Sequence, residues 1–340
     1  MIKVGLIGLG FMGQMHFGVY RKSKKARITA VADIDTAKLR GDVSKSVGNI
    51  PGAARTLDLS GVATFSSAEE LIRKGDVDMI DVCLPTYLHA KYAIDGLKAG
   101  KHVLCEKPLA LNSQEAKQVV AAAARSKGFL MTAMCIRFWP EYVYLKETID
   151  KKTFGKALAA RFTRLSPTPT WAWEGWLTKG AKSGGAALDL HVHDTDFILH
   201  AFGKPRAVSS TGLKIMTGAV DHIVTEYIYG KKGPSVVAEG GWAFPAAYPF
   251  RMFYNVQFEK ATVEFSTQAQ PTITVYQKDG RIQYPKMAAT DGYNVEINYF
   301  LDCIRRGKAP KVVTPAHAAL SVALIEKEVK SAMTQRVVNV

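Results

Sequence analysis

Residues 183–197, SGGAALDLHVHDTDF, gather several side chains suited to acid–base chemistry into one short segment. Asp189 and His193 are four residues apart, so a continuous helix over 184–202 would place them on one face. The ordinary pKa of histidine lies near neutrality, which suits a general base, and a neighbouring carboxylate can orient the ring. We therefore predict that His193 handles a proton and that Asp189 supports it or contacts the substrate.

Asp196 and His200 would continue the same helical face. Carboxylates and imidazoles also bind metals, but one helix cannot readily surround an ion, and no second cluster of ligands accompanies this one. We therefore predict no metal, and interpret Asp196 and His200 as a buried, hydrogen-bonded pair beneath the site. His191 points away from this face.

Arg137 and four tryptophans are the other candidates for substrate contacts. The fork of donors on Arg137 could hold substrate oxygens or pair with an acid. Aromatic faces suit the C–H faces of a sugar ring, but tryptophans also anchor loops and subunit contacts. The tryptophans concerned are Trp139, Trp171, Trp173 and Trp176. Arg137, Trp139 and Trp176 are the predicted substrate contacts.

The stretch GLGFMG at 8–13 matches the G-x-G-x-x-G pattern. Gly8 permits a tight turn, Gly10 lets the backbone approach a pyrophosphate, and Gly13 lets the following helix pack closely on the strand. The N–H groups at the start of that helix attract phosphates. The pattern predicts a dinucleotide site that also includes Phe11 and Met12.

Asp33 follows the glycine pattern at the distance expected for an acid that binds the ribose hydroxyls of NAD. Its carboxylate would repel the 2′-phosphate of NADP, so the sequence predicts NAD. Lys38 and Arg40 lie nearby and could tolerate that phosphate, which leaves NADP possible.

Composition restricts the class of protein. The 340 residues are 47% hydrophobic and 22% charged, which is typical of globular domains. The net charge of +15 is spread along the chain, so nucleic-acid binding is not expected. No apolar run spans a bilayer and no signal peptide is recognisable, so we expect a cytoplasmic protein without membrane association. The cysteines lack CxxC spacing, which argues against structural zinc.

Hydrophobic periodicity predicts an α/β chain with two domains. Strands at 3–10, 28–33, 79–85, 102–108 and 129–135 alternate with helices at 12–23, 66–75, 88–100 and 113–128, which is typical of a doubly wound parallel sheet. Successive strands follow after about residue 150, with helices at 184–202, 292–306 and 315–335, which predicts an open, largely antiparallel sheet. The predicted boundaries are 1–135, 136–315 and a C-terminal helix and tail at 316–340.

Several motifs together resemble a known family. They are GLIGLGFMG, VADID (31–35), LPTYLHA (84–90), HVLCEKPLALNSQEA (102–116), CIRFWP (135–140) and the segment that contains Asp189 and His193. In this combination the chain resembles the glucose–fructose oxidoreductase and inositol dehydrogenase family over nearly its whole length. The resemblance implies a Rossmann domain followed by an α/β domain with an open antiparallel sheet. It also implies NAD(P)-dependent oxidation or reduction of sugars, cyclitols and related polyols, and no metal.

The resemblance implies roles for individual residues. Lys107 of the EKP motif would lie near the nicotinamide and the substrate hydroxyl, and Glu106 near the nicotinamide ribose. The residues that would line the cofactor are Pro85, Thr86 and His89. Asp189 and His193 match the family's second motif, whereas His191 stands where the family usually has a small residue. Whether Lys107 or His193 takes the proton first stays open.

The expected function is hydride transfer between a secondary alcohol and nicotinamide, an activity of the EC 1.1.1 type. Two alternatives stay open: an enzyme that keeps NAD tightly bound and recycles it, and a non-catalytic NAD-sensing protein on the same scaffold. Apolar residues on both faces of MFYNVQF (252–258) and ATVEF (261–265) would fit a homodimer or homotetramer packed through the C-terminal sheet.

Overall fold

The computed structural model describes residues 1–46, 48 and 55–340, which form two compact units. The first unit comprises Met1–Cys135, Thr170–Trp176 and Gly292–Val322. The second unit comprises Ile136–Pro169, Leu177–Asp291 and Ala323–Val340. No helix in the described part of the chain combines the length and the apolar character that a bilayer crossing requires.

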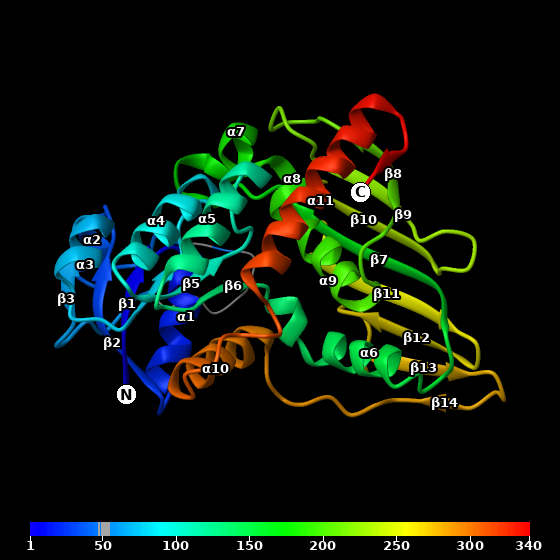
Figure 1. The fold of residues 1–340 in the computed structure, drawn as a ribbon, viewed down its shortest axis with the longest axis horizontal. Helices are drawn as coiled ribbons and strands as arrows, with labels where there is room; N and C mark the ends of the chain where they lie inside the picture. Colours follow the sequence, from blue (N-terminus) through cyan, green and yellow to red (C-terminus); the bar gives the residue numbers. More distant parts are fainter. Residues whose placement is uncertain (47, 49–54) are drawn as a thin grey trace. The chain divides into compact units, whose positions relative to one another are not determined.

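The first unit is built on a parallel sheet of six strands in the order β3-β2-β1-β4-β5-β6 (Figure 1). Its strands are β1 (Ile2–Ile7), β2 (Ala26–Ala32), β3 (Ala63–Phe65), β4 (Met79–Val82), β5 (His102–Glu106) and β6 (Leu130–Ala133). The strand order reverses between β1 and β4, so the ligand site of such a sheet lies beyond the carboxyl ends of these two strands. The predicted doubly wound sheet is confirmed.

The helices of the first unit lie between its strands or follow them in the chain. They are α1 (Phe11–Lys22), α2 (Thr36–Leu39), α3 (Ala68–Lys74), α4 (Thr86–Lys98), α5 (Ser113–Arg125) and α10 (Gly292–Arg305). The hydrophobic pattern did not predict α2 or β3. Both are short, β3 is largely exposed, and α2 buries no residue completely, so neither carries a recognisable apolar period.

The second unit contains a sheet of nine strands in the order β14-β13-β12-β11-β7-β10-β9-β8-β15. Its strands are β7 (Ala157–Pro167), β8 (Ala207–Leu213), β9 (His222–Ile228), β10 (Ser235–Phe244), β11 (Arg251–Phe258), β12 (Ala261–Ser266), β13 (Ile273–Gln277), β14 (Ile282–Gln283) and β15 (Val338–Asn339). Neighbouring strands pair antiparallel except β10 and β7, which pair parallel. The predicted, largely antiparallel sheet is therefore confirmed.

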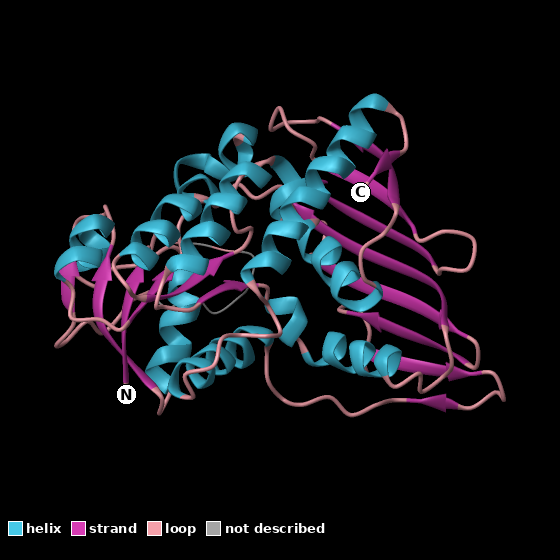
Figure 2. Ribbon diagram, viewed as in Figure 1, coloured by secondary structure: helices cyan, strands magenta, loops and turns pink. Residues whose placement is uncertain are grey.

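Helices α6 (Pro140–Asp150) and α9 (Val192–Phe202) lie along one face of this sheet (Figure 2). Between sheet and helices an aromatic core forms around Tyr142 of α6, whose ring meets Phe197 of α9 edge to face at 4.8 Å between centroids. Tyr254 of β11 lies 5.2 Å from the same ring. Each such pair adds about 0.5–1.5 kcal/mol beyond area burial.

The remaining helical elements of the chain are short except for the last. They are the 3₁₀ helices η1 (Cys135–Phe138) and η2 (Trp173–Thr178), α7 (Gly180–Ser183), α8 (Gly185–Asp189) and α11 (Pro315–Thr334). The prediction of one continuous helix over 184–202 was wrong, because a turn at Leu190 and His191 separates α8 from α9, although both residues keep right-handed helical backbone angles.

Along each strand of the second sheet, side chains point alternately toward the core and toward the outer face. Across five strands a row of side chains runs Glu226, Val237, Arg161, Asn255 and Glu264, as the strand register requires. All five are exposed or half-buried. This face therefore combines charges with apolar groups and is less apolar than the sequence pattern suggested.

Candidate functional site

The glycine turn lies beyond the carboxyl end of β1. Gly8 has φ +93, and a Cβ atom there would overlap the carbonyl oxygen of Cys83. A Cβ atom at Gly13 would overlap the carbonyl oxygen of Gly8, so α1 packs directly on the turn. A Cβ atom at Gly10 would meet no atom within 4 Å, and no side chain caps α1 there. The turn therefore leaves open space beside free helix N–H groups, which fits a pyrophosphate.

Asp33 directly follows β2 and is tied to this turn. Its Oδ2 accepts a hydrogen bond from the Leu9 N–H at 2.7 Å, and its Oδ1 accepts one from the Asp35 N–H at 2.9 Å. Lys38 Nζ lies 3.6 Å from the same carboxylate. Asp33 is thus fixed beside the glycine turn. Phe11 is half-buried at the start of α1.

Met12, a predicted cofactor contact, is partly buried against the hydrophobic cluster that includes Leu9 and Phe17. Its side chain therefore packs against the hydrophobic core and supports the glycine turn from below.

Lys107 comes directly after β5 and is half-buried. The side chain of Glu106 folds back onto it, because Glu106 Oε2 accepts a hydrogen bond from the Lys107 N–H at 3.0 Å. Parallel strands present their carboxyl ends at one edge of the sheet, so Lys107 belongs to the same edge as the glycine turn.

Pro85, Thr86 and His89 lie at the start of α4, with Pro85 as its N-cap. Thr86 and His89 are each 1% exposed. The two ring nitrogens of His89 each lie 2.7 Å from a carbonyl oxygen, one of Leu84 and one of Pro108, and burial lowers the pKa of this histidine. His89 therefore links the turn after β4 to the turn after β5.

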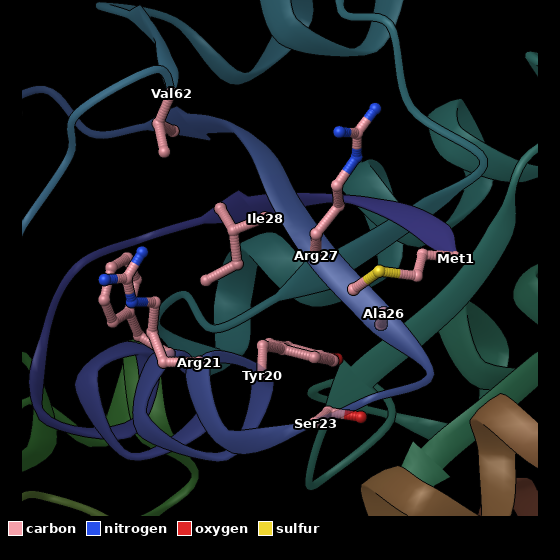
Figure 3. Close-up of a pocket in the computed structure, with 9 residues that line it drawn as sticks. Met1, Tyr20, Arg21, Ser23, Ala26, Arg27, Ile28 and Val62 are labelled. Atoms are coloured by element: carbon pink, nitrogen blue, oxygen red, sulfur yellow. The ribbon is translucent and has the colours of Figure 1, made fainter.

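A small pocket of about 140 Å³ in the first unit is a different feature. Figure 3 shows that Tyr20, Arg21, Ala26 and Ile28 line it. Ala26 and Ile28 belong to the first half of β2, whereas Asp33 follows its last residue. The pocket therefore lies toward the end of the sheet opposite the glycine turn.

In the second unit, two arginines hold α9 by buried ion pairs. Arg164 of β7 donates to both carboxylate oxygens of Asp194, at 2.8 and 3.0 Å. Arg137 of η1 donates to both oxygens of Asp196, at 2.7 and 2.8 Å. All four side chains are at most 2% exposed. The two pairs fix the first turns of α9, which carry His193.

Glu328 of α11 holds the same segment from another side. Its Oε2 lies 2.9 Å from His191 Nε2, and its Oε1 accepts a hydrogen bond from the Thr195 hydroxyl at 3.1 Å. His191 is fully buried, and a Cβ atom on Gly240 would crowd its ring. His191 therefore stabilises this buried segment. Gly240, which has no side chain, leaves room for its ring.

Most of the charged residues in the 183–197 segment thus brace the core, while Asp189 and His193 are half-buried. Asp196 is buried and hydrogen-bonded, as predicted, and Arg137 holds both of its carboxylate oxygens, while its pairing with His200 stays a prediction. Burial lowers the pKa of His200 to about 4, which keeps its ring neutral near pH 7. The Arg137–Asp196 pair agrees with the alternative that the arginine pairs with an acid.

The tryptophans occupy different places. Trp139 is the half-buried N-cap of α6. Trp176 is half-buried in η2 and belongs to the first unit, as does Trp173, which is 42% exposed.

Among the described residues, Asp189, His193, Asp196 and His200 do not form a set with metal-binding spacing. The set that does consists of His16, Asp81 and Cys83, whose ligand atoms lie within 4.8 Å of one another. His16 Nδ1 and Asp81 Oδ2 already bond at 2.8 Å, and burial raises the pKa of the Cys83 thiol far above its usual range. The three side chains already contact one another through hydrogen bonds.

Sequence reasoning missed His16 and Asp81. A usable signal was present: Gly13, His16 and Tyr20 follow at spacings of three and four, which places them on the face of α1 that packs on the sheet.

Comparison with known proteins agrees with this geometry. The model of an oxidoreductase family with an NAD-binding Rossmann fold matches residues 2–134, and the model of the GFO/IDH/MocA C-terminal domain matches residues 142–282. The chain belongs to the GFO/IDH/MocA oxidoreductase family. Its first unit therefore contains an NAD-binding Rossmann domain.

Similar members of the family include two inositol dehydrogenases. The chain is 30% identical to myo-inositol 2-dehydrogenase of Thermotoga maritima over 203 residues, 60% of this chain and 55% of that protein. It is 23% identical to inositol 2-dehydrogenase of Rhizobium meliloti over 350 residues, which cover 100% of this chain and 99% of that protein. A solved structure of levoglucosan dehydrogenase with NADH and levoglucosan superposes with a TM-score of 0.83 at 22% identity, covering 100% and 99% of the two chains. That likeness shows the family fold.

The position of Asp33 predicts a change in cofactor preference. Asp33→Asn keeps the shape of the side chain but removes the charge that repels a 2′-phosphate, and Lys38 remains nearby. We expect the ratio of NADPH to NADH affinity to rise at least about tenfold, since a bond to a charged group contributes about 1.5–3 kcal/mol. Fluorescence titration of both cofactors measures this ratio. The matched control, Asp35→Asn, alters the N-cap of α2 and should leave the ratio within about twofold; an unchanged ratio in the Asp33 variant would contradict the assignment.

Proposed function

We propose that this protein is an NAD-dependent dehydrogenase that moves a hydride between a secondary alcohol of a sugar, cyclitol or related polyol and nicotinamide. The observation that carries the proposal is Lys107, placed directly after β5 at the ligand edge of an NAD-binding sheet and held there by Glu106. Relatives named for inositol, levoglucosan and dihydrobenzene-diol support the substrate class, because each name denotes a ring compound with hydroxyl groups.

The proton is assigned to residues of this chain. NAD, when bound, supplies the hydride acceptor. We propose that Lys107 and His193 handle the hydroxyl proton and that Asp189 orients His193 or contacts the substrate. His193 suits this role because α9 is fixed around it while its own side chain stays half-buried rather than enclosed.

Arg137 takes a supporting part in this proposal. Its guanidinium holds Asp196 through two hydrogen bonds and is 2% exposed. We therefore propose that Arg137 positions α9, and that Trp139 and Trp176, which are half-buried, offer aromatic faces to the substrate.

The outer face of the second sheet is proposed to pack against another copy of the chain. Arg161 lies between Asn255 and Val237, with Glu264 and Glu226 beyond them, so the row carries charges of both signs. We expect sedimentation velocity to show a dimer or tetramer, and Arg161→Glu to weaken association by about tenfold or more, because the charged residues of the row are then all negative and repel those of the facing copy. A wild-type monomer at all concentrations would contradict this.

The function is tested by measuring NADH formation by absorbance over a panel of cyclitols, sugars and sugar acids, with NAD and NADP in parallel. Steady turnover of a ring polyol is the expected result. Tight NADH binding without turnover of any polyol would contradict the proposal and favour a protein that retains or senses the cofactor.

A further inference from the structure

A buried chain of polar groups connects α1 to the end of β5 within the first unit. His16 of α1 is completely buried, and its Nδ1 lies 2.8 Å from Asp81 Oδ2 on β4. On the other side of the ring, His16 Nε2 forms an ion pair with Glu106 Oε1 at 3.1 Å, without an aligned hydrogen bond. Tyr20, one turn further along α1, donates to Asp81 Oδ2 at 2.8 Å.

Two buried carboxylates, Asp81 and Glu106, flank the His16 ring. The side chains of Asp81 and Glu106 are 0% and 7% exposed, and two carboxylates in the interior are costly without a cation between them. Burial alone lowers the pKa of His16, but Cys83 and Asp81 outweigh it and raise that pKa well above its ordinary value. In return, although burial opposes it, contact with His16 lowers the pKa of Glu106. His16 and Glu106 therefore stabilise each other across this contact.

Glu106 is consequently held at both oxygens. His16 faces Oε1, while Oε2 accepts the hydrogen bond from the Lys107 N–H. This second bond fixes the backbone of the turn after β5. The Lys107 side chain extends from that turn, so its direction depends on the bond.

We propose that His16 is a positioning residue, which holds the carboxylate of Glu106 in the orientation that places Lys107 for proton handling. The inference rests on the proposed function only where it gives Lys107 a role in turnover. The link from His16 through Glu106 to the Lys107 N–H stands on the contacts themselves.

Two neutral variants separate positioning from simple stability. His16→Gln places an amide near the position of Nε2 and keeps a donor toward Glu106, whereas His16→Asn places one near Nδ1 and keeps a donor only toward Asp81. Both remove the same charge from the same buried site. We expect H16N to lower kcat by about tenfold or more and H16Q to stay within about threefold of the wild type, because a misplacement of about 1 Å can cost up to about 100-fold.

The matched control is Tyr20→Phe, which removes a buried hydrogen bond to the same Asp81 without touching Glu106. We expect its kcat to stay within about twofold of the wild type. In a Glu106→Gln background, H16N should produce no further loss, because its effect passes through that carboxylate. Equal kcat for H16N and H16Q, or an undiminished loss in the Glu106→Gln background, would overturn the proposal.

A readout without substrate separates this inference from the proposed function. Hydrogen exchange of the Lys107 amide, followed by NMR in the full chain, should be faster by about tenfold in H16N and close to wild type in H16Q. That pattern would support the positioning link even if no polyol were turned over. Unchanged exchange in both variants would contradict the link from His16 through Glu106 to the Lys107 N–H, even if the dehydrogenase activity were established.

Discussion

We expect Lys107→Met to lower kcat for polyol oxidation by about 1,000-fold, the middle of the range for a positioned acid–base group. Methionine preserves the length and apolar stem of the lysine but has no amine to accept or share a proton. Because the glycine turn and Asp33 are untouched, NADH affinity stays within about threefold. Steady-state kinetics and NADH titration on the same preparation measure both quantities.

Lys98→Met serves as the matched control, since Lys98 is exposed in the last turn of α4 in the same unit. Its kcat should remain within about twofold of the wild type. A Lys107 variant that folds, binds NADH and keeps more than about a tenth of the wild-type kcat would remove Lys107 from the proton-handling role.

Asp194→Ala destabilises the second unit by about 3–5 kcal/mol, because it leaves Arg164 buried and charged without its partner. A hydrogen bond from Arg164 to the Tyr142 hydroxyl, at 3.2 Å, cannot balance a full charge. The urea midpoint monitored by tryptophan fluorescence reports the loss, since Trp242 lies in the core of this unit.

Two further variants serve as controls for Asp194→Ala. Asp150→Asn, which removes an exposed acid paired with Lys146 on α6, should cost less than about 0.5 kcal/mol. The double variant Arg164→Met/Asp194→Leu should recover most of the stability lost in Asp194→Ala, because no isolated charge remains. A midpoint for Asp194→Ala close to that of the wild type would show that the pair does not hold α9.

The cofactor half of the site could be predicted because its signals are local. Gly8, Gly10 and Gly13 act within one turn, and Asp33 follows at a characteristic distance. The alternation of strands and helices then predicts the parallel sheet, and Lys107 was found through the resemblance of the EKP motif to a known family. Short elements such as β3 escaped prediction because they bury too little surface to show a period.

The substrate half could not be resolved from the sequence, because its partners are remote. Asp194 and Arg164 are 30 residues apart, and His191 and Glu328 are 137 apart. No local pattern distinguishes the acids and histidine that brace α9 from Asp189 and His193. The break at Leu190 and His191 also depends on packing, since the side chain of His191 turns inward to Glu328.

The central claim is hydride transfer from a secondary alcohol carbon to NAD, and isotope transfer tests it most directly. A ring polyol that is turned over would be supplied with deuterium on the carbon being oxidised, and the NADH formed would be analysed by mass spectrometry. We expect one deuterium in each NADH, with a ketone as the other product. Consumption of the polyol with unlabelled cofactor, or NADH bound with no label ever entering it, would contradict hydride transfer from the alcohol carbon.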